Sequence, residues 1–255
     1  MKVTIIGHSG SFPGPVSPAS CYLVRAQAQG RTWSIALDLG NGSLGALQRH
    51  LDPHDLDAII LSHLHPDHCL DVCSLYVMRK YQPGGPARGR ILVYGPQGTA
   101  TRLARAYGVR RAEPLTSQFI FRDLLDAVPV TIGPFTVTPH LVAHSVEAYG
   151  IRVAADGQVL AYSGDTDLCE GLSRVSHDAD LMLADCAFVD GRDDVRGIHM
   201  TGSRAAQAAV DAGGVRRLML THIPAWNDPG VCRAQAATVW AGHVEVAVPG
   251  STYEL

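Results

Sequence analysis

The sequence predicts an α/β protein in which two mixed sheets pack face to face with helices outside, a four-layer αββα sandwich. Three observations lead to this fold class. A strand-rich stretch followed by mixed strands and helices occurs once in each half of the chain, several hairpins intervene, and no G-x-G-x-x-G turn follows the first strand. A doubly wound parallel sheet fits these features less well. We expect residues 1–255 to form a single domain.

Short apolar runs rich in β-branched and aromatic residues predict the strands. In chain order they are Val3–Ile6, Cys21–Ala26, Trp33–Leu37, Ala58–Leu61, Ile91–Tyr94, Val128–Ile132, Phe135–Leu141, Tyr149–Ala154, Val159–Tyr162, Leu181–Ala184, Arg217–Leu220 and Val244–Val248. The pair Asp156-Gly157 predicts a tight hairpin turn, because such a turn needs positive φ at its centre.

Longer segments with apolar residues at helical spacing predict the helices. They are Leu44–Leu51, Leu70–Tyr81, Gly98–Ala106, Ser203–Ala212 and Val231–Ala241. Thr201 is placed to cap the fourth helix through its hydroxyl group, and Gly213-Gly214 should end it.

The composition is that of an ordinary folded protein, with 46% hydrophobic and 18% charged residues. A net charge of −3 argues against a dedicated nucleic-acid binder, which usually carries a basic stripe. No apolar run approaches the roughly 18 residues that would span a membrane. The N-terminus lacks the features of a signal peptide, and the six cysteines form no C-x-x-C pair, so we expect a cytoplasmic protein.

The run His63-Leu64-His65-Pro66-Asp67-His68 puts three imidazoles and a carboxylate into one tight turn. Imidazole nitrogens and carboxylate oxygens are ligands that suit zinc and neighbouring divalent metals. The run follows the predicted strand Ala58–Leu61, and strand ends are where α/β folds place their sites. The turn is therefore a candidate metal site.

Four further polar residues lie next to the ends of predicted elements. His144 follows the strand Phe135–Leu141, and Asp165 follows Val159–Tyr162. His222 follows Arg217–Leu220, while His199 precedes the helix at Ser203. One histidine in such a place is usually a capping or surface residue, but four with the 63–68 turn indicate one shared site.

Together these segments resemble the metallo-β-lactamase-fold hydrolases, and the resemblance covers nearly the whole chain. The residues that carry it are Ser62-His63-Leu64-His65-Pro66-Asp67-His68, His144, Ser163-Gly164-Asp165-Thr166 and Leu220-Thr221-His222-Ile223, with Asp38 at the place of an early buried aspartate. His199-Met200-Thr201, with His199 lying 23 residues before His222, resembles the ribonuclease Z branch of phosphodiesterases.

The resemblance implies two divalent metal ions, with zinc expected and Mn²⁺ or Fe²⁺ as alternatives. His63, His65 and His144 would hold one ion. Asp67, His68 and His222 would hold the other, and Asp165 would bridge both. Two such ions can share a hydroxide and neutralise a phosphodiester oxygen.

Three residues receive catalytic roles. Asp67 would hydrogen-bond the hydroxide as well as bind metal. His199 is left over from the metal count, so we expect it to bind the phosphate or to act as general acid at the leaving oxygen. Asp185 stands where ribonuclease Z-like chains often carry Glu, and we expect this shorter carboxylate to orient His199. Asp38 should be structural, as a partner to a ligating histidine.

The expected substrate is a small phosphodiester. Members of this branch that process transfer RNA carry a long arm between the positions matching His144 and Asp165, where this chain has 20 residues and a hairpin. Segments 14–20, 44–50 and 221–226 look most like an actinobacterial group linked to 3′,5′-cyclic nucleotide hydrolysis. We therefore expect hydrolysis of a cyclic nucleotide such as cAMP to the 5′-monophosphate.

Alternatives stay open at this point. They are a 2′,3′-cyclic or other phosphodiesterase and a ribonuclease Z-like tRNA 3′-end endonuclease, although the missing arm makes tRNA an unexpected substrate. Trp226, four residues past His222, could stack on a base or simply pack on the sheet. No membrane partner is expected, and a homodimer is suggested by analogy with related chains.

Overall fold

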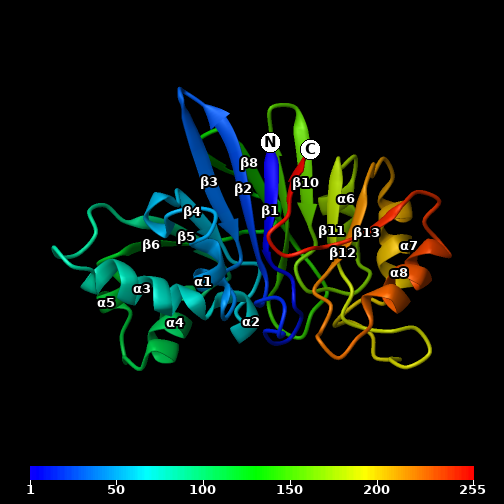
Figure 1. The fold of residues 1–255 in the computed structure, drawn as a ribbon, viewed down its shortest axis with the longest axis horizontal. Helices are drawn as coiled ribbons and strands as arrows, with labels where there is room; N and C mark the ends of the chain where they lie inside the picture. The colour runs from blue at the N-terminus through cyan, green and yellow to red at the C-terminus, as the bar shows by residue number, and fades with distance from the viewer.

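The computed structural model describes all residues 1–255 and contains two seven-stranded sheets that face each other. Figure 1 shows helices α1 to α5 beside one sheet and α6 to α8 beside the other, while the two chain ends lie close together. The predicted αββα fold class is therefore confirmed. No helix in the structure combines the length and apolar character needed to cross a membrane.

The first sheet has the order β14-β1-β2-β3-β4-β5-β6. Its strands are β1 (Lys2–Gly7), β2 (Cys21–Ala28), β3 (Arg31–Leu37), β4 (Ala58–Ile60), β5 (Ile91–Gly95), β6 (Phe119–Asp123) and β14 (Thr252–Glu254). Pairing is antiparallel from β14 to β3 and parallel from β3 to β6.

The second sheet repeats this arrangement with the order β13-β12-β11-β10-β9-β8-β7. Its strands are β7 (Val130–Ile132), β8 (Phe135–Leu141), β9 (Tyr149–Ala155), β10 (Gln158–Tyr162), β11 (Leu181–Asp185), β12 (Leu218–Thr221) and β13 (Val244–Val246). The strands from β7 to β10 are antiparallel, and those from β10 to β13 are parallel. Both sheets are mixed, as the sequence predicts.

The helices cover the outer faces of the sheets. They are α1 (Ser43–Leu47), the 3₁₀ turn η1 (Pro53–Asp55), α2 (Pro66–Cys69), α3 (Asp71–Tyr81), α4 (Thr99–Tyr107), α5 (Glu113–Thr116), α6 (Glu170–Ser176), α7 (Gly202–Ala212) and α8 (Pro229–Ala237). The Thr201 hydroxyl accepts a hydrogen bond from the N–H of Arg204, and Gly213 ends α7, so both predicted caps are confirmed.

Central strands are buried on both faces because each sheet lies between the other sheet and a helix layer. Alternation along β4 makes this visible: Ile60 belongs to the core between the sheets, and Ile59 belongs to the core under the helices. Val24 and Leu23 divide in the same way on β2. These strands therefore read as continuous apolar runs in the sequence.

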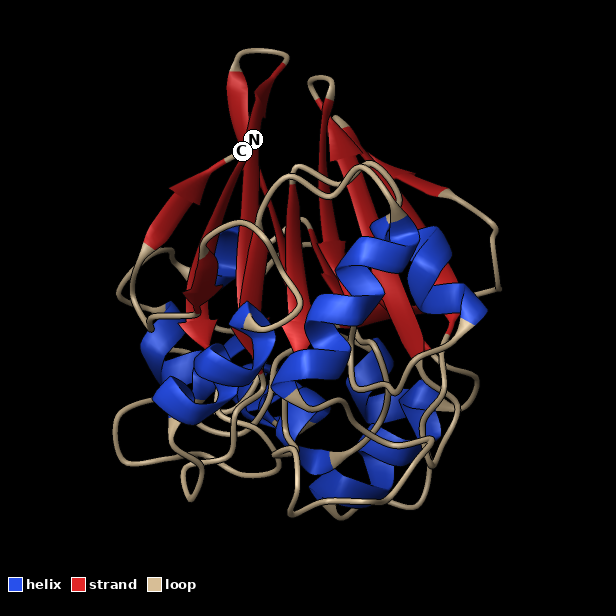
Figure 2. Cartoon of the chain, turned by 90° about the vertical axis from the view of Figure 1, so that its right-hand side faces the viewer, coloured by secondary structure: helices blue, strands red, loops and turns tan.

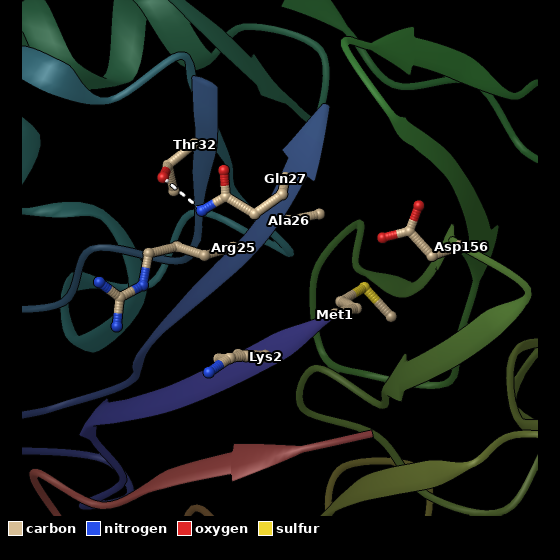
Figure 3. Close-up of a pocket in the computed structure, with 7 residues that line it drawn as sticks. All are labelled: Met1, Lys2, Arg25, Ala26, Gln27, Thr32 and Asp156. Atoms are coloured by element: carbon tan, nitrogen blue, oxygen red, sulfur yellow. Dashed lines mark hydrogen bonds between the residues drawn. The ribbon is translucent and has the colours of Figure 1, made fainter. Parts of the chain in front are cut away.

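The two ends of the sandwich differ. Figure 2 shows tight hairpins at the upper end of the strands and helices with long loops at the lower end. The β9–β10 hairpin turns at Asp156 (φ 54°) and Gly157 (φ 73°), the predicted positive-φ turn. A hollow of about 330 Å³ near this end is lined by Met1, Lys2, Asp156 and neighbouring residues (Figure 3), none of them from the predicted site.

Several predicted boundaries are wrong, and some elements were not predicted. The helix expected over Leu44–Leu51 ends at Leu47, and the one expected over Val231–Ala241 runs from Pro229 to Ala237, where Asp228 caps it. The elements that were not predicted are β6, β14, α2, α5 and α6. Each of these is seven residues or shorter, so it carries little periodic signal.

Candidate metal centre

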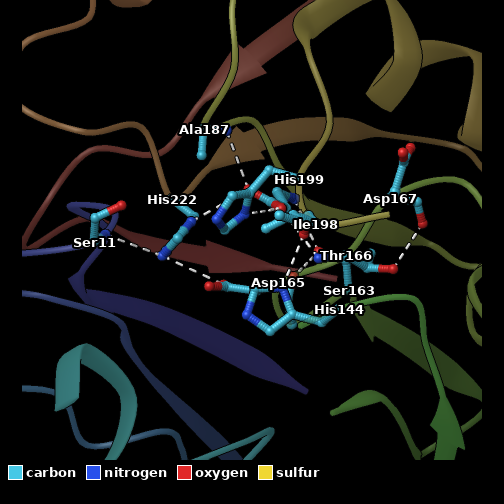
Figure 4. A network of polar contacts seen from close by, with 12 residues as sticks. Ser11, His144, Ser163, Asp165, Thr166, Asp167, Ala187, Ile198, His199 and His222 are labelled. Carbon is cyan, nitrogen blue, oxygen red and sulfur yellow. Dashed lines mark hydrogen bonds and ion pairs between the residues drawn. The ribbon is translucent and has the colours of Figure 1, made fainter. Parts of the chain in front are cut away.

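The candidate ligands come from loops that follow the carboxyl ends of strands in both sheets. The 63–68 turn follows β4, whereas His144, Asp165 and His222 follow β8, β10 and β12. Parallel strands place such ends along one edge, and the facing sheets bring two edges together. Figure 4 shows the second-sheet residues His144, Asp165 and His222 converging with His199 and Ser11.

The first group consists of His63, His65, His144 and Asp165, whose ligand atoms all lie within 4.8 Å of one another. His65 Nδ1 lies 3.0 Å from His63 Nε2 and 3.2 Å from His144 Nε2. Asp165 Oδ2 lies 3.6 Å from His63 Nε2. Three imidazole nitrogens and one carboxylate oxygen thus point at a common centre, an arrangement suited to a divalent cation.

The second group consists of Asp67, His68, Asp165 and His222, again within 4.8 Å. His68 Nε2 and His222 Nε2 lie 3.2 Å apart, and His222 Nε2 lies 3.2 Å from Asp67 Oδ2. Asp165 Oδ1 lies 3.2 Å from His68 Nε2. Each Asp165 oxygen therefore faces one of the two groups.

The donor atoms of the two groups suit metal ions. Asp165 Oδ1 is buried and makes no hydrogen bond of acceptable geometry, while His68 Nε2 and His222 Nε2 lie 3.2 and 3.3 Å away, so a cation between these atoms would satisfy all three. His63 Nε2, His65 Nδ1 and His144 Nε2 lie too close together for each of them to carry a proton. The His/Asp cluster is therefore able to bind metal ions.

The outward nitrogen of four of these candidate ligand histidines is anchored, as bound metals usually require. His68 Nδ1 donates to Asp38 at 2.7 Å, and His222 Nδ1 donates to Asp185 at 3.2 Å. His144 Nδ1 donates to the carbonyl oxygen of Ile198 at 2.9 Å. His63 Nδ1 lies 3.1 Å from the Ser62 hydroxyl.

Asp38 is fully buried behind the second group and adopts a left-handed backbone with φ 60°. Its carboxylate accepts hydrogen bonds from the Ser62 N–H at 2.7 Å, the Tyr162 hydroxyl at 2.7 Å and His68. This is the contact with a ligating histidine that the sequence predicts. The strained φ is tolerated because these bonds fix the residue.

The two groups differ in protonation. Burial, together with neighbouring imidazoles, holds the pKa values of His63, His65 and His144 below the usual range. Burial also opposes charge on His68 and His222, but the carboxylates around them outweigh it and raise their pKa values, that of His222 to about 10. The first group thus presents neutral ligands, whereas the second holds protons that a cation must displace.

Asp185 accepts four hydrogen bonds. Its Oδ2 accepts from the Thr166 N–H at 3.1 Å and from His199 Nδ1 at 2.9 Å. Its Oδ1 accepts from the Ala187 N–H at 3.1 Å and from His222 Nδ1 at 3.2 Å. Asp185 also lies in a third cluster with Asp165, His199 and His222. Since all its acceptor positions are used, Asp185 fits an orienting role better than a metal-ligating one.

His199 stands beside the two groups without belonging to either. Its Nδ1 is bound to Asp185, so its Nε2 remains for a ligand, and its side chain is only 13% exposed. Burial lowers the pKa of His199, but the charge and hydrogen bond of Asp185 raise it above the ordinary value. His199 can therefore hold a proton at the edge of the site near neutral pH.

A surface pocket of about 320 Å³ opens onto both groups and is lined by Ser11, His65, Asp67, His144, Asp165 and His199 among others. A second pocket of about 330 Å³ shares Ser11 and His199 with it and adds Phe188, Arg192 and Trp226. Trp226 is 65% exposed and lies against Phe12, with ring centroids 4.6 Å apart. Trp226 is thus mostly exposed and packs on Phe12, and its stacking on a base stays a prediction.

Ser11 is a site residue that the sequence reading did not single out. Its N–H lies 3.3 Å from His222 Nε2, and its backbone is left-handed with φ 62°. The neighbouring Gly10 makes this approach possible, because a Cβ there would lie 2.3 Å from the His222 carbonyl oxygen. No side-chain pattern singles out Ser11, and of this stretch the sequence shows only that it holds no G-x-G-x-x-G turn.

Comparison with known proteins supports the same fold. A family model described as "Beta-lactamase superfamily domain" matches residues 35–223. An uncharacterized protein of Mycobacterium tuberculosis strain H37Rv is 40% identical over 259 residues, which cover 100% of this chain and 92% of its own length. The probable metallo-hydrolase YhfI of Bacillus subtilis is 29% identical over 255 residues and is covered, like this chain, in full.

The crystal structure of YhfI, described as a metallo-beta-lactamase fold protein, has a TM-score of 0.87 at 28% identity and covers 100% of this chain and 99% of its own. Ribonuclease Z of Streptomyces coelicolor is 28% identical over 302 residues, covering 96% of this chain and 95% of its own length. The chain therefore belongs to the beta-lactamase superfamily, as a metallo-hydrolase whose His/Asp cluster can bind metal ions.

Proposed function

We propose that this protein is a metal-dependent phosphodiesterase that hydrolyses a 3′,5′-cyclic nucleotide such as cAMP to the 5′-monophosphate. The observation that carries the proposal is the pair of adjoining ligand groups that share Asp165, with the proton-holding His199 at their edge. Two cations bound side by side in these groups would balance the negative charge of a phosphodiester, and a proton donor would neutralise the alkoxide leaving group.

We assign one divalent ion to His63, His65, His144 and Asp165 and a second to Asp67, His68, His222 and Asp165. Zinc is the expected metal, because five imidazoles outnumber the two carboxylates in this donor set. When bound, the two ions would lower the pKa of a water molecule toward neutrality and neutralise charge on the phosphate.

Asp67 and His199 then position the attacking water and protonate the leaving group. Asp67 lines the pocket, where its carboxylate would accept a hydrogen bond from the attacking water and fix the direction of attack. His199, with Nδ1 bound to Asp185, presents Nε2 and donates its proton to the leaving oxygen. A positioned general acid contributes roughly 10²- to 10⁴-fold to such a step.

A small substrate is supported by the loop between the first-group ligand His144 and the bridging Asp165. The β9–β10 hairpin fills that interval, and its strands pair from Gln158–Ala155 to Tyr162–Ile151 without an insertion. The alignment with Streptomyces coelicolor ribonuclease Z is longer than this chain, so that relative carries insertions. A surface arm that could grip tRNA has no counterpart in this interval.

The second pocket supports a nucleotide as the substrate. It adjoins the metal pocket through Ser11 and His199, so it lies where the part of a substrate beyond the phosphate would extend. The exposed ring of Trp226 and the Phe188 side chain offer surfaces on which a base can stack, a contact that contributes about 1–3 kcal/mol. We therefore assign Trp226 and His199 to substrate binding.

A second candidate is a ribonuclease Z-like tRNA 3′-end endonuclease or a 2′,3′-cyclic phosphodiesterase. The similarity to ribonuclease Z over 96% of the chain favours it. A substrate panel separates the candidates: cAMP, cGMP, 2′,3′-cAMP, bis(p-nitrophenyl) phosphate and a precursor tRNA, assayed with zinc-, manganese- and iron-loaded protein. We expect cAMP turnover to 5′-AMP. Cleavage of the precursor tRNA without turnover of cAMP or cGMP would defeat the proposal.

A further inference from the structure

Asp167 and Arg204 form a buried ion pair beside the segment that carries His199. Asp167 lies two residues past Asp165 in the loop after β10, and Arg204 lies in the first turn of α7. The Arg204 guanidinium contacts the Asp167 carboxylate, and the two side chains are only 12% and 6% exposed. A pair this well buried contributes little net stability, because desolvation offsets its attraction, so its presence invites another explanation.

The pair binds the backbone at Gly197 and at His199 itself. The Gly197 N–H donates to Asp167 Oδ2 at 2.7 Å, and Arg204 Nη1 donates to the His199 carbonyl oxygen at 3.3 Å. Between these two bonds, the carbonyl oxygen of Ile198 accepts from His144 Nδ1 at 2.9 Å. Figure 4 shows Ile198 between His199 and His144, with Asp167 to the right of them.

We propose that Asp167 and Arg204 are positioning residues that fix the segment Gly197–His199 for catalysis. The segment sets the place of His199 Nε2 through its backbone and the direction of the His144 ring through the Ile198 carbonyl. One ion pair thus positions both the proton donor and an outer contact of a first-group metal ligand. The inference rests on the proposed function in taking His199 as the donor to the leaving oxygen.

The physical basis is geometric precision. A donor displaced by about 1 Å loses on the order of 10²-fold in rate. Outer contacts of ligating histidines typically change metal affinity by about 10- to 100-fold when removed. The planar guanidinium suits this task, since it can bind a carboxylate and a carbonyl oxygen at once in fixed directions.

The test compares Arg204→Met with Arg204→Lys, and uses Arg174→Met as the matched control. Arg174 forms an exposed ion pair with Glu170 within α6, far from the 197–199 segment in the chain. Two substrates separate proton donation from other steps: thymidine 5′-phenyl phosphate has a poor leaving group, and thymidine 5′-(p-nitrophenyl) phosphate has a good one that needs little protonation.

For Arg204→Met we expect kcat on the phenyl ester to fall about 10- to 100-fold, with KM nearly unchanged and a much smaller loss on the nitrophenyl ester. Arg204→Lys should lose less kcat than Arg204→Met, because lysine keeps the positive charge but lacks the planar guanidinium that binds two oxygens at once. In ¹⁵N-histidine NMR spectra, the His199 and His144 resonances should shift in Arg204→Met and stay in place in Arg174→Met.

Equal losses on both esters with unmoved histidine resonances would overturn the inference and leave Arg204 a purely structural residue. Unchanged kinetics and unchanged spectra would overturn it as well. Failure of the proposed function looks different: the wild-type protein would then not turn over cAMP, whatever its activity on the two esters. In that case the histidine resonances, with zinc affinity measured by chelator competition, would still decide whether Arg204 positions the segment.

Discussion

Replacement of Asp185 by Asn is the most informative single change within the site. The carboxylate is completely buried and accepts hydrogen bonds from two imidazoles and two backbone N–H groups. Asparagine keeps the shape but offers only one acceptor oxygen. Its NH₂ group must then face an N–H of either Thr166 or Ala187, which leaves that donor unsatisfied.

The expected magnitudes follow from these bonds. A hydrogen bond to a charged group contributes about 1.5–3 kcal/mol, which corresponds to roughly 10- to 100-fold in rate if His199 is no longer held. The unsatisfied buried N–H costs about 1–3 kcal/mol of stability. For a domain of this size we expect the Tm to fall by about 2–4 °C for each kcal/mol.

The sign of the pH effect is also fixed. In the proposed mechanism His199 acts as the acid only when protonated, so kcat should fall as pH rises through its pKa. Asp185 raises that pKa against the effect of burial. Without the carboxylate the pKa falls, and the alkaline limb of the kcat profile should therefore move to lower pH.

The assay is a pH–rate profile for cAMP with wild-type, Asp185→Asn and Asp180→Asn proteins at equal metal content. Asp180 precedes the same strand, β11, at its opposite end, where it accepts from the Val159 N–H and from Arg216. It controls for the loss of a carboxylate as such. A kcat profile in Asp185→Asn that coincides with wild type would refute the assigned role of Asp185.

Three further predictions concern other parts of the site. Trp226→Ala should raise the KM for cAMP by about 5- to 100-fold through lost stacking, while metal content measured by elemental analysis stays the same; an unchanged KM would place the base elsewhere. Gly10→Ala should lower the affinity of the second metal group, because the new Cβ meets the His222 carbonyl oxygen; zinc titration against a chelator measures this, and wild-type affinity would show that the loop can give way. In chelator-stripped protein, the raised pKa values of His68 and His222 mean that the folded state binds protons more tightly than the unfolded state. Its free energy of unfolding should therefore fall as pH rises from about 6.5 toward 10, where His222 titrates. It should also fall below about pH 6.5, because the lowered pKa values of His63, His65 and His144 mean that the unfolded state binds protons more tightly on these three groups. Urea unfolding at several pH values measures it, and a flat profile between about pH 6.5 and 10 would contradict the assigned protonation.

The fold class and the convergence of the ligands were predictable from sequence for a physical reason. Buried strands are recognisable in the sequence as short apolar runs, and polar residues directly after such strands must lie at a sheet edge. His63, His144 and Asp165 are all of this kind. The resemblance to known hydrolases then grouped them, and the structure brings the same residues within 4.8 Å in two groups.

Other features could not be read from sequence because they depend on distant pairing. β14 is three residues long and exists through its pairing with β1 at the other end of the chain. Arg204 reads as an ordinary residue in the first turn of a helix, yet it reaches Asp167 in a loop 37 positions earlier. Ser11 enters the site through a left-handed backbone, which no side-chain pattern indicates.

The most direct test of the central claim is the hydrolysis of cAMP by protein that has been stripped of metal and then reloaded. Stripped protein should be inactive, and added zinc should restore formation of 5′-AMP, followed by chromatography. An Asp67→Ala variant treated in the same way should stay inactive. Turnover of cAMP that persists without metal, or that Asp67→Ala retains in full, would contradict the account.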